Sequence, residues 1–224
     1  ESGGISAYGG IHSHQLENNY DGTIDLTKIK NSIRTNDVHF PSTRLISIEN
    51  THNKCYGFPL QLDYIDKLSD IANENNIKIH MDGARIFNAS ISIGSSVKNI
   101  LKRIDSVSFC LSKGLGSPIG SIICGTNQFI SRARRIRKSL GGGMRQTGII
   151  SSFGIYSLKN MIDRLKIDHS NAQYLATHLN KLNFINTKPE YVKTNIVYFK
   201  FNHSKLEFEK FLNYCKYNKI LFGI

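Results

Sequence analysis

The stretch "LDYIDKLSDIANENNIKIHMD", Leu62 to Asp82, places a helix pattern directly before a strand pattern. Apolar residues recur at the three- and four-residue spacing of one helix face: Leu62, Ile65, Leu68, Ile71 and Ala72. This spacing predicts an amphipathic helix over 62–76. In residues 77–82 apolar residues alternate with polar ones up to Asp82, which predicts a strand. The order of these two elements matters because it repeats along the chain.

Strand and helix patterns alternate on both sides of this stretch. We predict further strands at 44–49, 106–112, 120–125 and 194–201, and the start of another at 220–224. We predict further helices at 97–104, 127–140 and 205–219, with a helical pattern over most of 146–182. Such alternation predicts an α/β fold with a mostly parallel sheet. Residues 1–165 would form the large domain, and residues 166–224 a connecting helix and the start of a smaller α+β domain.

The net charge is the one unusual feature of the amino-acid composition. Of 224 residues, 40% are hydrophobic and 21% are charged, an ordinary globular balance. The formal net charge is +12. It is compatible with a nucleic-acid partner, an anionic ligand or a lysine-rich surface. Only one basic run is dense, from Arg132 to Ser139, and a solvated helix face is its structural interpretation.

Composition also excludes several classes of protein. No apolar run reaches the roughly 18 residues that span a bilayer, and no signal peptide opens the chain, so we expect no membrane contact. Four cysteines lie far apart, without zinc spacing: Cys55, Cys110, Cys124 and Cys215. We therefore expect no disulfide, no structural metal and a cytoplasmic location. Because the chain opens at Glu1 and closes in the strand-like "LFGI", we expect both ends to be cut.

Residues that close the predicted strands are the candidates for a site, because ligands of parallel sheets bind beyond the carboxyl ends of the strands. In "MDGAR", Asp82 leaves a strand, Gly83 allows a tight turn, and Arg85 follows. A surface turn in which Arg85 pairs with Asp82 is the structural alternative. Lys113 closes a later strand, with a helix between, so Asp82 and Lys113 can lie at the same sheet edge.

An aspartate and a lysine on neighbouring strand ends are what a pyridoxal phosphate site needs. The lysine amine forms a Schiff base with the cofactor, and the carboxylate keeps the pyridine nitrogen protonated. Ser112 and the glycines after Lys113 can offer hydroxyl and backbone N–H groups to a phosphate.

Two histidines and a glycine-rich run complete the candidates. A lone histidine is more often structural than catalytic, but His52 follows a strand between Asn50 and Asn53, which favours a site position. His39 precedes Phe40 and Pro41 and has no such context. The run "LGGGMRQTG" follows a helix and lacks the Lys-Ser/Thr ending of a phosphate loop, which argues against a nucleotide.

Four motifs together resemble one family: "IENTHN", "HMDGARIFNAS", "FCLSKGLGSPIGS" and "RRIRKSLGGGMRQTG". They are similar to motifs of the low-specificity threonine aldolases, pyridoxal-phosphate-dependent lyases of the aspartate aminotransferase fold (fold type I). The resemblance runs in order from "ESGG" to the strand near Asn195. It implies a retro-aldol cleavage of L-threonine or L-allo-threonine to glycine and acetaldehyde, in threonine catabolism and glycine biosynthesis.

The resemblance also implies roles for individual residues. Lys113 would carry the cofactor, Asp82 would pair with its pyridine nitrogen, and Arg85 would reach its phenolic oxygen and the substrate carboxylate. His39 would lie near the substrate hydroxyl as the base. Lys138 and Arg145 would reach the site of a neighbouring subunit, since family members are typically homotetramers with sites shared within a dimer.

The chain departs from the family pattern in two respects. The family's phosphate-binding Gly-Thr pair and ring-stacking histidine precede the segment matching "ESGG", and its carboxylate-binding arginine follows the segment matching "LFGI". Tyr56 and Phe58 stand where "THNxxGG" has smaller or polar residues. Alternatives are another fold type I lyase that catalyses β-elimination, a catalytically incomplete paralogue, and a nucleic-acid-binding protein that uses "RARRIRK".

Overall fold

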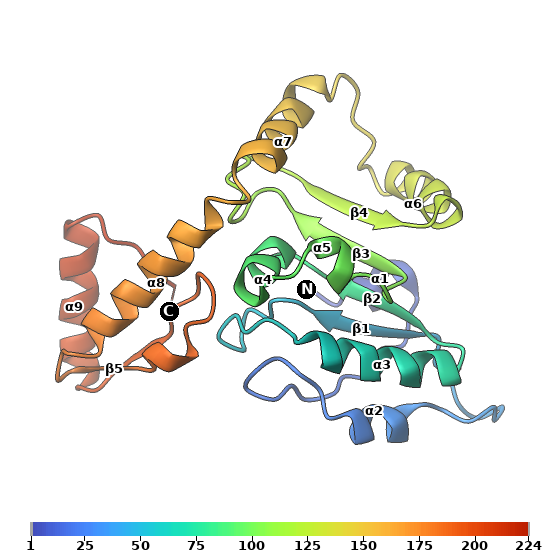
Figure 1. Ribbon diagram of the computed structural model, residues 1–224, viewed down its shortest axis with the longest axis horizontal. Helices are drawn as coiled ribbons and strands as arrows, with labels where there is room; N and C mark the ends of the chain where they lie inside the picture. The colour runs from blue at the N-terminus through green and yellow to red at the C-terminus, as the bar shows by residue number, and fades with distance from the viewer. Residues whose placement is uncertain (1, 224) are drawn as a thin grey trace.

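A four-stranded sheet lies at the centre of the computed structural model, which describes residues 2–223. Its strands lie in chain order: β1 (Leu45–Glu49), β2 (Lys78–Asp82), β3 (Ser106–Cys110) and β4 (Ser121–Gly125). β1, β2 and β3 are parallel, and β4 returns antiparallel to β3 (Figure 1). The predicted α/β fold with a mostly parallel sheet is therefore confirmed.

One face of this sheet is buried by helices that follow its strands. These helices are α3 (Leu62–Glu74), α4 (Ile86–Ile93) and α5 (Val97–Ile100). Ile65 and Leu68 of α3 join Ile79 and Met81 of β2 in the main core, and each of them is at most 1% exposed. Burying one such side chain contributes about 1.5–3 kcal/mol. Because strand residues alternate between faces, His80 and Asp82 lie on the opposite face from this core.

The remaining elements precede and follow the sheet in the chain. Before it come α1 (Gly4–Gly9) and α2 (Leu26–Ser32). After it come α6 (Asn127–Ser139), α7 (Gly148–Asn160), α8 (Leu165–Leu179), β5 (Ile185–Thr187), the 3-10 turn η1 (Pro189–Tyr191), β6 (Phe199–Phe201) and α9 (Lys205–Tyr217). β5 and β6 form a small antiparallel sheet beside α8 and α9 (Figure 1). The division into domains at residue 165 stays a prediction.

Three predicted elements differ from the structure. The strand expected over 194–201 is formed only at β6, because β5 offers three partner residues and the residues before β6 bind other loops through side chains. No strand forms over 220–223, and Ile224 lies outside the described residues. There Ile220 donates its N–H to the Cys215 carbonyl and closes α9 instead. The helix expected over 97–104 ends at Ile100, and turns continue from Leu101 to Arg103.

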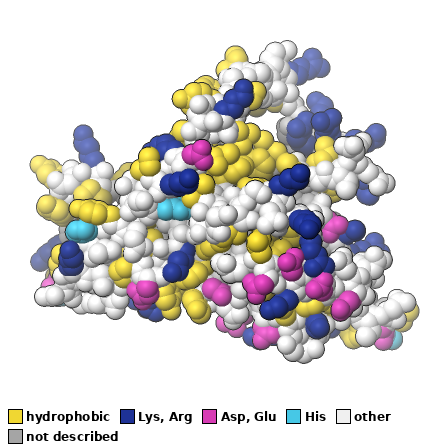
Figure 2. All heavy atoms as spheres, viewed as in Figure 1, with side chains coloured by type: hydrophobic (Ala, Val, Ile, Leu, Met, Phe, Trp, Pro, Cys, Tyr) yellow, Lys and Arg dark blue, Asp and Glu magenta, His cyan; other side chains and the backbone are white. Residues whose placement is uncertain are grey.

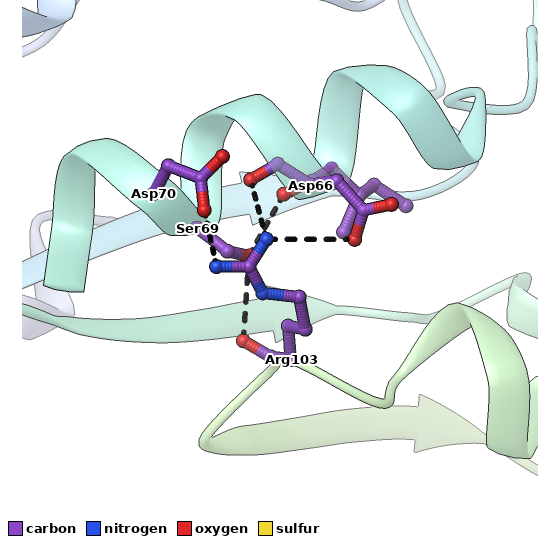
Figure 3. Close-up of polar contacts among 5 residues, drawn as sticks. Asp66, Ser69, Asp70 and Arg103 are labelled. Carbon is purple, nitrogen blue, oxygen red and sulfur yellow. Dashed lines mark hydrogen bonds and ion pairs between the residues drawn. The ribbon is translucent and has the colours of Figure 1, made fainter.

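Arg103 fastens α3 to the amino end of β3 (Figure 3). Its guanidinium donates to the Asp66 carbonyl at 3.1 Å and pairs with the carboxylates of Asp66 and Asp70. Ser69 Oγ contacts the Arg103 carbonyl in turn, at 3.4 Å. This network lies at the edge of the sheet opposite to the carboxyl ends of the parallel strands, so it supports the fold rather than the site.

The region of α6, α7 and β4 leaves apolar side chains at the surface. In α6 no residue is buried, and its basic side chains gather at the upper right of Figure 2. Large apolar residues of this region are exposed: Ile119, Ile123, Phe129, Ile136, Leu140, Met144, Ile149 and Phe153. No helix within residues 2–223 is long and apolar enough to pass through a bilayer.

Candidate active site

The sheet register brings three polar side chains into one row at the carboxyl edge. Glu49 of β1 is paired with Asp82 of β2, and Asp82 is paired with Ser108 of β3. Neighbouring strands lie about 4.8 Å apart, and paired residues point to the same face. A second row, one step back along the strands, consists of Ser47, His80 and Ser106. The face that the helices leave uncovered is thus polar where ligands of parallel sheets bind.

Asp82 is held by the turn that follows β2. Its Oδ1 accepts the N–H of Ala84 at 2.9 Å, and Gly83 donates its N–H to the Ser108 carbonyl at 2.7 Å. A Cβ on residue 83 would lie 3.0 Å from Val107 Cγ2 and 3.1 Å from the Ser108 carbonyl oxygen, so only glycine fits without adjustment. Asp82 and Arg85 do not form an ion pair within residues 2–223, which leaves the carboxylate exposed for another partner.

Lys113 lies in a compact turn between β3 and β4. Leu111 donates its N–H to the Gly120 carbonyl at 2.9 Å, and Ser117 donates to the Leu111 carbonyl at 3.0 Å. Leu111 and Leu115 bury their side chains beneath this turn, whereas Ser112 and Lys113 are exposed. The apolar residues around the lysine therefore anchor the turn and present its amine beyond the carboxyl end of β3.

Arg85 connects the two turns. It is half-buried at the N-terminus of α4, and it lines a small pocket together with Cys110 and Gly114. Gly114 directly follows Lys113, so this pocket joins the "DGAR" turn of β2 to the lysine turn of β3. Three predicted cofactor residues, Asp82, Arg85 and Lys113, thus follow adjacent strands at one edge.

His52 lies at the same edge, in the loop that follows β1. Its Nε2 is 3.5 Å from Glu49 Oε2, and Glu49 also accepts the N–H of Asn53 at 3.1 Å. Asn50 donates its backbone N–H to the Asp82 carbonyl at 2.8 Å, which ties this loop to β2. Three buried atoms of consecutive residues have no hydrogen-bond partner within residues 2–223: Asn50 Nδ2, Thr51 Oγ1 and His52 Nδ1. Unpaired buried polar atoms are rare in native proteins, and their concentration favours a functional site here.

His80 is a site-face residue that the sequence reasoning missed. Its Nδ1 is 2.9 Å from Ser106 Oγ and its Nε2 is 3.4 Å from Ser108 Oγ. Burial lowers the pKa of His80 below its ordinary value, while the negative charge of Asp82 opposes this shift. The alternation of "IKIHMD" was the available signal, because it places His80 two residues before Asp82 on one face.

Three predicted residues lie away from this edge. His39 is exposed in the segment that leads to the amino end of β1, and its Nδ1 is 2.8 Å from Asp37 Oδ1 in the same turn. Lys138 is exposed near the end of α6, and Arg145 is exposed between α6 and α7. The roles assigned to these residues stay predictions.

The fold defines the class of this protein. Its structure is similar to a Listeria monocytogenes protein assigned as an L-allo-threonine aldolase, with a TM-score of 0.84 and 23% identity over 96% of this chain and 58% of that one. It is also similar to the threonine aldolase of Leishmania major, with a TM-score of 0.69 and 19% identity over 83% of this chain and 54% of that one. The chain has the α/β architecture of the fold type I pyridoxal-phosphate enzymes.

The sequence comparisons place the chain within a family. Residues 1–202 match the beta-eliminating lyase family, and the chain belongs to it. The chain is 42% identical to low-specificity L-threonine aldolase 1 of Arabidopsis thaliana, over 99% of this chain and 63% of that protein. It is 45% identical to the low specificity L-threonine aldolase of Escherichia coli K12, over 80% of this chain and 53% of that protein. The matched part therefore covers only about half to two-thirds of these relatives' length.

Proposed function

We propose that this protein is a pyridoxal-phosphate-dependent aldolase that cleaves L-threonine or L-allo-threonine to glycine and acetaldehyde. The observation that carries the proposal is the pairing of Asp82, the last residue of β2, with Ser108 in the middle of β3, and the position of Lys113 in the turn that follows β3. Membership of the beta-eliminating lyase family and the names of the relatives support it.

The residues present fit the cofactor. Lys113 is exposed, so its amine is accessible for covalent attachment, and it lies near Ser112, whose hydroxyl suits a phosphate. Asp82 Oδ1 accepts a hydrogen bond from the Ala84 N–H. The carboxylate is exposed and can still accept a hydrogen bond from a protonated ring nitrogen. Arg85, at the pocket shared with Gly114, suits the phenolic oxygen and a substrate carboxylate. When bound, pyridoxal phosphate supplies an electron sink for the electron pair of the broken Cα–Cβ bond.

The chain's own residues would divide the remaining work. Lys113 Nζ would hold the cofactor and yield its place to the substrate amine. The Asp82 carboxylate would keep the proton on the ring nitrogen through charge and hydrogen bonding. Arg85 would orient the substrate through its carboxylate.

Two histidines are candidates for the base that takes the proton of the substrate β-hydroxyl. His39 is the residue that the motif resemblance assigns. His52 is the residue at the sheet edge, where its Nε2 lies 3.5 Å from Glu49 Oε2. Comparison of His39→Asn with His52→Asn separates them, because loss of the base lowers kcat for threonine cleavage by about 10²-fold or more.

We also propose that the protein is a cytoplasmic homo-oligomer, up to a tetramer, that acts in threonine catabolism and glycine biosynthesis. Exposed apolar residues support an oligomer: Ile136 in α6, and Leu140 and Met144 in the segment between α6 and α7. Lys138 and Arg145 lie in the same region and would reach a neighbouring subunit's site. Light scattering of Leu140→Glu against the unchanged protein tests the assembly, with a lower molar mass expected for the variant.

Product analysis tests the reaction itself. The protein is incubated with pyridoxal phosphate and L-threonine, and in parallel with L-serine and L-cysteine. Glycine and acetaldehyde in equal amounts from L-threonine support the aldolase. Pyruvate and ammonia from L-serine or L-cysteine would assign a β-eliminating lyase, and no product from any substrate would favour an incomplete paralogue. Salt-sensitive binding of RNA or DNA without cofactor uptake would assign the basic run to nucleic acid.

A further inference from the structure

The segment Tyr191–Tyr198, which we call the strap, lies against the loop that follows β1 and against α4, which packs on the turn of Lys113. It joins η1 to β6, and its residues up to Tyr198 belong to no strand. Figure 1 shows this part of the chain, in orange, beside the loop that joins β1 to α3. Its side chains and carbonyls bind residues more than 100 positions earlier in the sequence.

Thr194 binds the loop that carries His52. Its Oγ1 donates to the Gly57 carbonyl at 2.8 Å, and Thr194 is fully buried. Gly57 in turn donates its N–H to the His52 carbonyl at 3.1 Å, so one residue connects the strap to the histidine. A Cβ on residue 57 would lie 2.7 Å from Thr194 Oγ1, and the φ of +69° also favours glycine. The contact is therefore tight.

Asn195 binds Asn88 of α4, which packs against the turn that contains Lys113. Its Oδ1 accepts from Asn88 Nδ2 at 2.6 Å, and Asn88 of α4 is 2% exposed. Gly114, directly after Lys113, packs against this amide, because a Cβ there would lie 3.4 Å from Asn88 Oδ1 and 2.9 Å from Leu165 Cδ2. Any shift of Asn88 changes the space that the lysine turn occupies.

Three further contacts join the strap to the loop that carries His52, and two of them involve Tyr56 and Phe58, which depart from the family pattern. Tyr198 donates its hydroxyl to the Asn53 carbonyl at 2.9 Å, next to His52. The Tyr191 ring packs edge-on against Tyr56 at 5.1 Å and Phe58 at 5.6 Å between centroids. Tyr56 has a φ of +56°, which is costly for a tyrosine, and these ring contacts offset part of that cost.

We propose that Thr194 and Asn195 are positioning residues, Thr194 for His52 and Asn195 for Lys113. The chain bends at Thr194 and Asn195, and their side chains bind two different segments, Thr194 the Gly57 carbonyl and Asn195 the Asn88 amide. The strap thereby sets the separation between the histidine and the lysine. The catalytic meaning of this separation rests on the proposed function, but the positioning itself is measurable without cofactor or substrate.

Hydrogen exchange followed by mass spectrometry tests the positioning on the cofactor-free protein. Thr194→Val keeps the shape and removes the donor, and Thr194→Ser restores it. Asn195→Ala removes the acceptor of Asn88, and Asn186→Ala, at an exposed position of β5, is the matched control. Rates are normalised to amides of α3, so that a general loss of stability cancels.

Each variant is expected to loosen its own loop. Thr194→Val should raise exchange over 52–58 by about threefold to tenfold, the effect of one lost hydrogen bond, and leave 111–117 unchanged. Asn195→Ala should raise exchange over 111–117 and leave 52–58 unchanged. Thr194→Ser and Asn186→Ala should change exchange in neither loop. Equal effects of Thr194→Val and Asn195→Ala on both loops, or no change beyond the control, would overturn the proposal. Should Thr194→Val fail to fold, the response of 111–117 to Asn195→Ala decides.

A second measurement separates this proposal from the proposed function. Pyridoxal phosphate is added, and the rate at which absorbance of the attached cofactor develops is followed. Asn195→Ala should slow this rate relative to Asn186→Ala, and equal rates would count against Asn195 as a positioning residue. Failure of the unchanged protein to take up the cofactor would contradict the proposed function, and the exchange result would still decide the positioning.

Discussion

The helices α3 and α6 are each 13 residues long and amphipathic, yet the apolar face of α3 is buried and that of α6 is exposed. α3 buries Ile65 and Leu68 against β2, at 1% and 0% exposure. α6 buries no residue, and Ile136 and Leu140 at its end are 55% and 64% exposed. The pattern of a helix therefore predicts that it has an apolar face, but not what covers that face. α3 is covered by its own sheet, whereas the apolar residues of α6 stay exposed within the described part of the chain.

The same contrast separates two parts of the proposed site. The edge beside α3 and α4 contains Asp82, Arg85, Lys113 and His52 within one folded unit. The part on and after α6 contains Lys138 and Arg145, whose predicted roles need a second copy of the chain. Loss of function should therefore be greatest for residues of the first part.

Removal of Lys113 is expected to have the largest effect. Lys113→Ala should abolish cofactor attachment and threonine cleavage, because the Lys113 amine forms the covalent bond to the cofactor in the proposed chemistry. Lys102→Ala, in the turn before β3 rather than after it, is the control and should retain both. Absorbance and product formation are measured together. Full activity of Lys113→Ala would remove the lysine from the mechanism.

Neutralisation of Asp82 should have the next largest effect. Asp82→Asn keeps the size of the side chain but loses the charge that holds the proton on the ring nitrogen. We expect kcat to fall by about 10²-fold, as on removal of one electrostatic contact to the reacting centre. Asp63→Asn, on the exposed side of α3, serves as the control. Equal kcat values for Asp82→Asn and Asp63→Asn would contradict the electronic role of Asp82.

Truncation of Leu68 in α3 and of Leu140, which directly follows α6, compares the two environments. Leu68→Ala should lower the free energy of unfolding by about 2–5 kcal/mol, since it leaves a cavity in the core. Leu140→Ala should change it by about 0.5 kcal/mol or less in dilute protein, where no partner covers α6. Urea denaturation gives both values. At higher protein concentration the Leu140→Ala effect should grow if copies associate through α6, and equal losses in dilute protein would contradict the comparison.

The smallest effect concerns the pH dependence of stability. Burial holds the pKa of His80 below 6.5 in the folded state, so the unfolded chain binds more protons at mildly acidic pH. Stability from this source is present above about pH 6.5 and is lost as the pH falls towards the folded pKa. His80→Gln should therefore show a smaller fall in unfolding free energy between pH 7 and pH 5. An unchanged pH profile would show that His80 does not titrate this way.

The local parts of the fold could be predicted from the sequence. The alternation of 62–82 predicts both α3 and β2, because each element has its own periodicity. The placement of Asp82 and Lys113 at one sheet edge follows from two strand ends with a helix between them. β6 was predicted too long, since strand length depends on the partner, and β5 provides only three residues.

Contacts between distant segments could not be predicted. Thr194 and Gly57 are 137 residues apart, and nothing local in either segment indicates that they meet. The contacts of His80 with Ser106 and Ser108 on another strand belong to this kind. The sequence alternation predicts only which face of β2 His80 lies on. No residue of α6 is buried within residues 2–223, so its amphipathic pattern alone predicts the helix and nothing about what covers it.

Trapping of the cofactor on its lysine tests the central claim most directly. The protein is mixed with pyridoxal phosphate, reduced with borohydride, digested and examined by mass spectrometry. The account predicts an absorbance band near the visible edge that is lost on reduction, and a phosphopyridoxyl group on the peptide that contains Lys113. Attachment to another lysine, or no attachment, would contradict the assignment of this sheet edge as a cofactor site.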